Sequence, residues 1–144
     1  MADERTLTVP GRFDELAHIS DFITQVARDA GFGEDDVFHI QMAVDEACSN
    51  IIEHGYGQDG GEDISLTCVL EANGDLRIEI RDRGRPFDPA QVPFPQIDTG
   101  KDDLDEVQIG GLGLYFMRKL MDEVTFHFNE KSGNRLTMVK RRPR

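Results

Sequence analysis

Apolar residues recur every three or four positions in two segments of the N-terminal half, which is the spacing typical of amphipathic helices. The first segment covers residues 14–30 and is followed by Gly31. The second covers about 34–54 and is followed by Gly55 and Gly57. Because glycine commonly ends a helix, these residues mark the expected helix ends. Each helix should bury one face against a shared core.

Alternating apolar and polar residues predict strands in the rest of the chain. Asn73-Gly74 is a strong hairpin signal between two of them. The expected strands cover residues 6–9, 64–70, 76–80, 124–128 and 136–139, with a third helix at 110–121 and a turn at 129–134. This order predicts a single α+β domain over residues 1–144, a two-layer sandwich. Its sheet should be mixed but mostly antiparallel, with the helices on one face.

The segment 85–109 differs from the rest of the chain. It holds four prolines followed by an acidic run at residues 102–106. We interpret it as a long, mobile connection. A loop of this length inside a compact domain is more often functional than accidental.

Composition narrows the classes of function. The 144 residues are 38% hydrophobic and contain no apolar stretch long enough to span a membrane. The N-terminus lacks the apolar core of a secretory signal, so we expect a cytoplasmic protein. Cys48 and Cys68 lie in helix and strand patterns and are expected to be buried thiols. The basic end, residues 140–144, is expected to be a solvated tail.

The net charge of −12 argues against binding to nucleic acid, because phosphates require a basic surface. A basic protein surface would be attracted instead. Any anionic nucleotide would need Mg²⁺ and local hydrogen-bond donors to overcome the overall negative field.

The second helix carries polar residues that suggest chemistry. Glu46, Asn50 and His54 are spaced four residues apart, so they lie along one helix face beside the apolar stripe. An amide oxygen suits Mg²⁺, and a carboxylate one turn away can act as a base. The alternative is a solvated polar flank, which the spacing alone would favour.

Asp82 follows the predicted strand 76–80 and precedes Arg83 and Gly84. A carboxylate at a strand end could accept a hydrogen bond from the amine of adenine. Gly84 would allow the base to approach the backbone. Asp and Gly are also common where a strand simply enters a loop.

Residues 110–114 read Gly-Gly-Leu-Gly-Leu and open the third helix. Because glycine is costly inside a helix, three in four positions need a reason. Backbone N–H groups at a helix start can hold phosphates. The alternative is a tight loop packed on the sheet. The pattern matches neither a P-loop nor a dinucleotide-binding fingerprint.

In this order the motifs resemble the N, G1 and G2 boxes of the GHKL ATPases, whose ATP site is the Bergerat fold. The details are similar to the anti-sigma factor serine kinases of RsbW and SpoIIAB type. The resemblance spans nearly the whole chain and rests on Asp45-Glu46-Ala47 with Asn50, His54-Gly55-Tyr56, Asp82 to Pro89, Gly110 to Leu114 and Asn134 to Lys140.

The resemblance implies a histidine kinase-like ATPase fold that uses ATP and Mg²⁺. Glu46 would be the catalytic carboxylate, Asn50 would hold Mg²⁺ and Asp82 would read the adenine amine. Residues 85–109 would be the ATP lid. The implied ATP-binding residues are Asn50, His54, Asp82, Gly84, Gly110, Gly111, Leu112, Gly113, Leu114 and Thr137.

The resemblance further implies an ATP-dependent serine/threonine kinase that phosphorylates an anti-anti-sigma (STAS) protein, sequesters a sigma factor and forms a homodimer. Two alternatives are an ATP-binding module that sequesters partners without kinase activity and a partner-switch kinase with a non-sigma output. His18 lies in the first helix without a dimerisation domain, so a packing or surface role is expected. Ile51 departs from the alanine common in the family. None of the cations Arg83, Arg85, Lys101 and Arg118 stands out as a hydrogen-bond donor to a phosphate group.

Overall fold

The computed structural model describes residues 3–52, 61–83, 115, 117–129 and 133–142. The elements, in chain order, are β1 (Asp3–Gly11), the 3₁₀-helix η1 (Phe13–Glu15), α1 (Leu16–Asp29), α2 (Glu34–Asn50), β2 (Gly61–Leu70), β3 (Leu76–Asp82), β4 (Glu123–Asn129) and β5 (Gly133–Lys140). Residues 115 and 117–120 are also helical. His54, Gly84, residues 85–109 and residues 110–114 lie outside the described part of the chain, so the expectations for them stay predictions.

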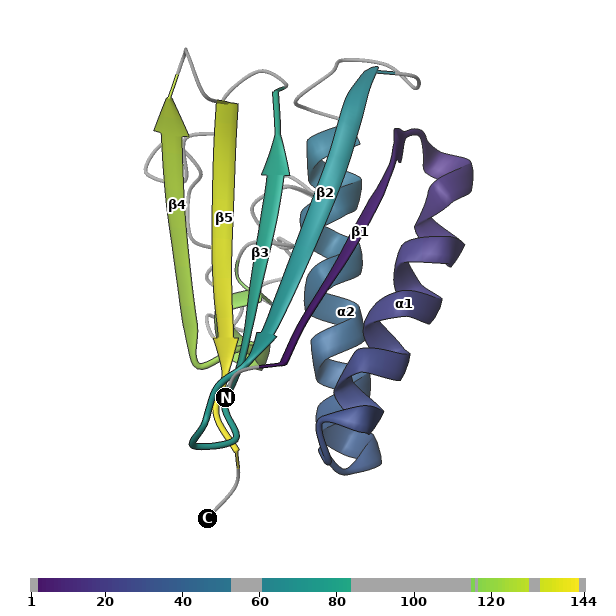
Figure 1. The fold of residues 1–144 in the computed structure, drawn as a ribbon. Helices are drawn as coiled ribbons and strands as arrows, with labels where there is room; N and C mark the ends of the chain where they lie inside the picture. The colour runs from purple at the N-terminus through teal and green to yellow at the C-terminus, as the bar shows by residue number, and fades with distance from the viewer. Residues whose placement is uncertain (1–2, 53–60, 84–114, 116, 130–132, 143–144) are drawn as a thin grey trace, which may run out of the picture.

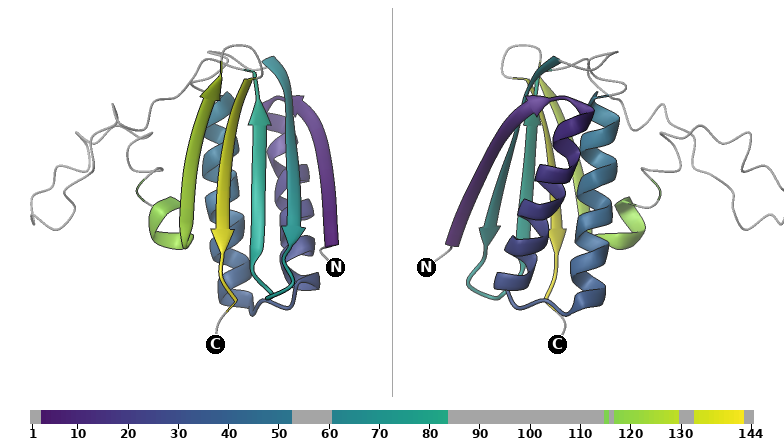
Figure 2. Two further views of the ribbon diagram at one scale, coloured as in Figure 1. Left: turned by 60° about the vertical axis from the view of Figure 1, so that its left-hand side comes forward. Right: turned by 90° about the vertical axis from the view of Figure 1, so that its right-hand side faces the viewer.

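Five strands form one sheet in the order β1-β2-β3-β5-β4, and every pairing among them is antiparallel. The expectation of a mostly antiparallel sheet is confirmed. Figures 1 and 2 show α1 and α2 side by side on one face of this sheet. The fold is the two-layer α+β sandwich predicted from the sequence.

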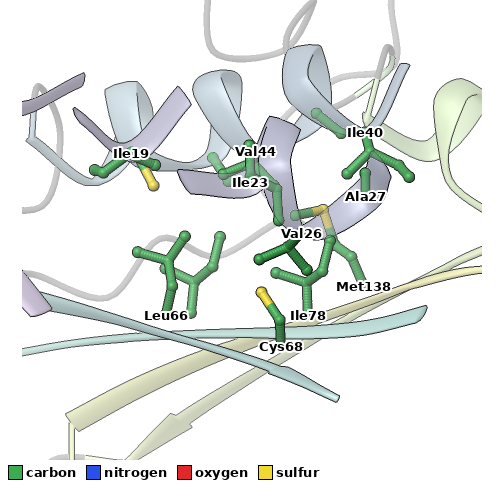
Figure 3. Packing of buried hydrophobic residues seen from close by; sticks show 14 of the residues in the cluster. Ile19, Ile23, Val26, Ala27, Ile40, Val44, Leu66, Cys68, Ile78 and Met138 are labelled. Carbon is green, nitrogen blue, oxygen red and sulfur yellow. The ribbon is translucent and has the colours of Figure 1, made fainter. Parts of the chain in front are cut away.

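The core lies between the two helices and this face of the sheet (Figure 3). Ile19 and Ile23 of α1 and Ile40 and Val44 of α2 are fully buried. They face alternate residues of the strands, such as Leu66, Cys68, Ile78 and Met138. This division follows from the two periodicities, since a helix buries every third or fourth residue and a strand every second.

Two turns are specified by a glycine in the local sequence. Gly31 has a φ of +93°, and the N–H of Phe32 donates to the carbonyl of Ala27 at 3.3 Å, which ends α1 in a Schellman-type motif. Gly74 has a φ of +94° in the β2–β3 hairpin, beside an Asn73 side chain that accepts from the N–H of Asp75. Both turns need a backbone conformation that glycine adopts without strain.

The C-terminal basic segment is not a free solvated tail in its described part. Lys140 belongs to β5, and its Nζ donates to the carbonyl of Leu120 at 2.6 Å. The N–H groups of Arg141 and Arg142 donate to carboxylates of Asp122 and Asp75. The prediction was wrong for Lys140, which is part of β5 and has a half-buried, bonded side chain, whereas Arg141 and Arg142 are exposed as expected.

Candidate nucleotide site

Two polar residues of α2 lie one helical turn apart beside the core. Glu46 is half-buried, and Asn50 is only 7% exposed. Ala47 and Cys48, the two residues that follow Glu46 in α2, are fully buried. The polar stripe therefore runs along the border of the core, as the sequence predicted, and Asn50 lies deeper than a solvated flank would.

The polar atoms of this part of α2 are not all satisfied by the protein. Asn50 Nδ2 and Asp45 Oδ1 are buried and find no hydrogen-bond partner among the residues that the structure describes. Burial, followed by the charge of Glu46, raises the pKa of Asp45 to about 6. Because a buried polar group without a partner costs about 1–3 kcal/mol, such atoms in a native fold need an explanation. We refer to Asp45, Glu46 and Asn50 as the helix polar cluster.

A second polar group lies where β3 ends. Asp82 and Asn134 of β5 are directly opposite each other in the sheet, and each is 8% exposed. Asn134 Nδ2 donates to Asp82 Oδ1 at 3.0 Å. The pair continues the row of buried cross-strand pairs Ile78–Met138 and Ile80–Leu136. We call Asp82 and Asn134 the strand-end pair.

Gly133 allows β5 to begin close against Asp82. Its φ is +93°, and a Cβ at this position would lie 2.6 Å from the Asp82 carbonyl oxygen. A side chain here would be strained by its backbone and would collide with the end of β3. The glycine therefore helps to set the position of the carboxylate.

Cys48 connects the two groups across the interface between α2 and the sheet. Burial raises the pKa of this thiol most, and the charges of Asp45 and Asp82 raise it further. The elements α2 and β3 end at Asn50 and Asp82, and Figure 1 shows both of these C-terminal ends at the same end of the molecule. The helix polar cluster and the strand-end pair therefore belong to the same end of the core.

Thr137 is not brought to this group. On β5 the even-numbered residues from Asn134 to Met138 are buried, so Thr137 points to the opposite, open face of the sheet, where it lies between Glu79 and Thr125 in the register. Asn134 stands beside Asp82 instead. Counting back by twos from the apolar residues Leu136 and Met138 would have identified it.

Magnesium fits this site as an ion held mainly by its nucleotide. The described residues contain no cluster of three or more His, Cys, Asp or Glu that could hold a metal. Mg²⁺ in nucleotide sites takes one or two protein ligands and relies on phosphates and water for the others. Asn50 could supply its side-chain Oδ1 as that single oxygen ligand, and its buried Nδ2 is a donor that could reach a phosphate oxygen instead.

The structure also shows the positions of several other residues named in the sequence analysis. Arg83 and Arg118 are exposed. His18 is exposed beside Glu15, with 3.4 Å between its Nδ1 and the Oε1 of that residue, which agrees with a surface role. Cys48 and Cys68 are buried and free, as predicted. None of the helices described here has the length and apolar character needed to cross a membrane.

Comparison with known proteins identifies the class. The model of the histidine kinase-like ATPase domain matches residues 9–140, and the chain belongs to this family. Within it, the chain is 33% identical to the serine-protein kinase RsbW of Bacillus subtilis over 144 residues, covering 96% of this chain and 86% of the relative. It is 30% identical to RsbW of Halalkalibacterium halodurans over 136 residues, covering 93% and 80%.

Solved structures agree on the fold. The structure of the RsbU and RsbW domains of Rv1364c from Mycobacterium tuberculosis matches 98% of this chain with a TM-score of 0.70 at 20% identity. The chain spans 33% of that longer protein. The histidine kinase domain of Erythrobacter litoralis EL346 matches 92% of this chain and 61% of its own length, with a TM-score of 0.52 at 18% identity.

Proposed function

We propose that this protein is an ATP-dependent serine/threonine kinase that phosphorylates an anti-anti-sigma (STAS) protein and also sequesters a sigma factor. The observation that carries the proposal is the buried, hydrogen-bonded pair of Asp82 and Asn134 at the end of β3, together with Glu46 and Asn50 one helical turn apart on α2. The relatives named as serine-protein kinases support the reaction. We further propose that the protein is cytoplasmic and acts as a homodimer.

Each residue of the site has a separate role in phosphoryl transfer. Asp82, held by Asn134, accepts a hydrogen bond from the adenine amine, and Gly84 leaves room for the base. Asn50 holds Mg²⁺, which when bound neutralises charge on the phosphates. Glu46 accepts the proton of the attacking hydroxyl. Phosphoryl transfer needs mainly positioning and charge neutralisation, which this set can supply.

The remaining assignments rest on the motifs. His54, Gly110, Gly111, Leu112, Gly113 and Leu114 are proposed to contact the nucleotide, and residues 85–109 to form the ATP lid. Thr137 was also implied by the family pattern. Because it points to the open face of the sheet, we propose that Asn134 stabilises Asp82 in its place.

Two measurements test this function. Calorimetry with ATP and Mg²⁺ should show binding by the wild type and weaker binding by Asp82→Asn, which removes the acceptor for adenine. Transfer of labelled phosphate to purified STAS-domain proteins of the same organism should occur with the wild type and stop in Glu46→Ala, while Glu46→Ala still binds ATP. Phosphorylation by Glu46→Ala would show that this carboxylate is not the base.

A different outcome would favour the first alternative. ATP binding without phosphate transfer to any STAS protein would indicate a partner-sequestering module that uses ATP as a conformational ligand. Transfer to a STAS protein whose partner is not a sigma factor would indicate a switch kinase with another output.

A further inference from the structure

The outer side of α2 exposes large apolar side chains next to acids. The part of the chain that the structure describes has three exposed large hydrophobic residues, and two of them, Phe38 (56%) and Met42 (37%), lie one turn apart on α2. Asp35 precedes Phe38 by three residues and Asp45 follows Met42 by three, so helical spacing puts both acids on the same side. We call these four residues the apolar–acidic patch.

The charged residues that α2 itself contributes have one sign. The described span of α2 contains five Asp and Glu residues and no Lys or Arg. Glu34 pairs with Arg28, and Asp36 lies 3.8 Å from Lys140. No ion pair is formed by Asp35 or Asp45 within the described chain. The patch therefore combines an apolar anchor site with two acids that form no ion pair in the described chain, Asp35, which is exposed, and Asp45, which is half-buried.

We propose that the apolar–acidic patch docks a basic segment of the phosphorylated partner, one that carries Lys or Arg on either side of an exposed apolar side chain. This inference rests on the proposed kinase function and adds the surface by which the substrate is recognised. Met42 lies one turn, about 6 Å along the helix axis, before Glu46. A partner seated on the patch would be held next to the proposed base.

Charge argues against the other occupants. A second copy of this chain would bring the same acids face to face and would be repelled, since the net charge is −12. The described residues of the chain's own basic end already have partners, because Lys140 Nζ donates to Leu120 and lies near Asp36, and the N–H groups of Arg141 and Arg142 donate to Asp122 and Asp75. A basic, amphipathic segment of another protein satisfies both the apolar and the acidic residues.

A synthetic peptide tests the chemistry without knowledge of the partner. The probe is a fluorescent amphipathic helix of about 18 residues made of Leu and Lys, and its control has Glu in place of Lys. Anisotropy with the full chain should show binding of the Lys peptide, weakened when salt rises from roughly 50 to 300 mM. The Glu peptide should not bind.

Matched variants locate the binding surface. Phe38→Ser with Met42→Ser should weaken binding of the Lys peptide by about tenfold or more, whereas Phe13→Ser, at the third exposed hydrophobic residue, should change it by less than about twofold. Asp35→Lys should weaken it, while Glu4→Lys, the same charge change on exposed β1, should have a smaller effect. Equal effects of the two charge changes would overturn the proposal.

The failure of this inference can be told apart from that of the kinase function. ATP calorimetry on the Phe38→Ser/Met42→Ser variant reports folding and the nucleotide site separately from docking. Once a STAS protein that the wild type phosphorylates has been found, it serves as the substrate. The Phe38→Ser/Met42→Ser variant should raise the KM for this STAS protein about tenfold and leave kcat and the KM for ATP unchanged. Sedimentation that shows a wild-type dimer dissociated by these two substitutions would assign the patch to a second copy and refute the proposal.

Discussion

Asp82 on β3 and Asn50 on α2 are almost equally buried, at 8% and 7% exposure, yet their polar atoms are in opposite situations. Asp82 accepts a hydrogen bond from Asn134 within the sheet, and the register of the whole β3–β5 ladder holds that contact. Asn50 Nδ2 has no hydrogen-bond partner in the described part of the chain. The strand-end pair is preorganised by the fold, whereas the helix polar cluster carries polar groups that a bound ligand could satisfy.

The contrast has an energetic consequence. Preorganised groups stabilise the protein whether or not a ligand is present, so their loss should cost stability and binding together. Unsatisfied buried groups lower the stability of the free protein, so their removal should leave the fold intact or strengthen it. Substitutions in the two regions should therefore have effects of opposite sign on the free energy of unfolding.

The largest effect is expected at Gly133. Gly133→Ala should lower the free energy of unfolding by about 3 kcal/mol, because alanine is strained at a φ of +93° and its Cβ would meet the Asp82 carbonyl oxygen. Gly31→Ala is the matched control, with the same φ but no atom within 4 Å of the added Cβ, and should cost about 1 kcal/mol. Urea unfolding measures both. Equal losses would show that the contact with Asp82 does not matter.

The next effect concerns the strand-end pair itself. Asn134→Ala removes a donor from a buried carboxylate and should cost about 2 kcal/mol, with weaker ATP binding. A double-mutant cycle with Asp82→Asn, followed by urea unfolding, isolates the pair. A coupling energy of about 1 kcal/mol is expected, and strict additivity would mean that the two side chains act independently.

These two positions also show how far sequence reasoning reaches. The helices and strands were predictable because α1 and the strands repeat their apolar residues at clear periods. Asp82 was found from its place at a strand end. The family pattern implied Thr137 and not Asn134, although strand alternation puts Asn134 on the buried face. The unpaired state of Asn50 Nδ2 could not be predicted, because it depends on whether any described neighbour places a hydrogen-bond acceptor beside it.

Asn50→Leu should act in the opposite direction. Leucine has the same branched shape as asparagine and removes the buried amide, so the free energy of unfolding should rise by about 1 kcal/mol while binding of Mg²⁺-ATP is lost. Gln41→Leu is the control on the same helix, because Gln41 Nε2 donates to Ser20 Oγ and its loss should destabilise. Thermal unfolding without nucleotide and calorimetry with it give the two readings. Destabilisation by Asn50→Leu would contradict the comparison.

The smallest effect is a pH dependence at Asp45. Its folded pKa of about 6 lies above the ordinary value of 3.8, so the folded protein holds this proton more tightly than the unfolded chain. The stability that the fold gains from protonated Asp45 is therefore complete below about pH 4 and is lost as pH rises through about 6. Asp45→Asn cannot ionise, so it should be more stable than the wild type by about 1 kcal/mol at pH 8, a value discounted for solvent screening of the half-buried carboxyl.

The same comparison at pH 4 distinguishes ionisation of Asp45 from other effects of the substitution. There the carboxyl of the folded wild type is protonated and the fold no longer buries a charge, so the difference between Asp45→Asn and wild type should shrink toward zero. Asp35→Asn controls for the removal of one negative charge from α2, and urea unfolding at the two pH values measures all three proteins. A stability difference for Asp45→Asn that is the same at both pH values would mean that the cost at this position arises from packing rather than from burying a charge. In that case the unpaired groups of α2 would have to be explained by Asn50 alone.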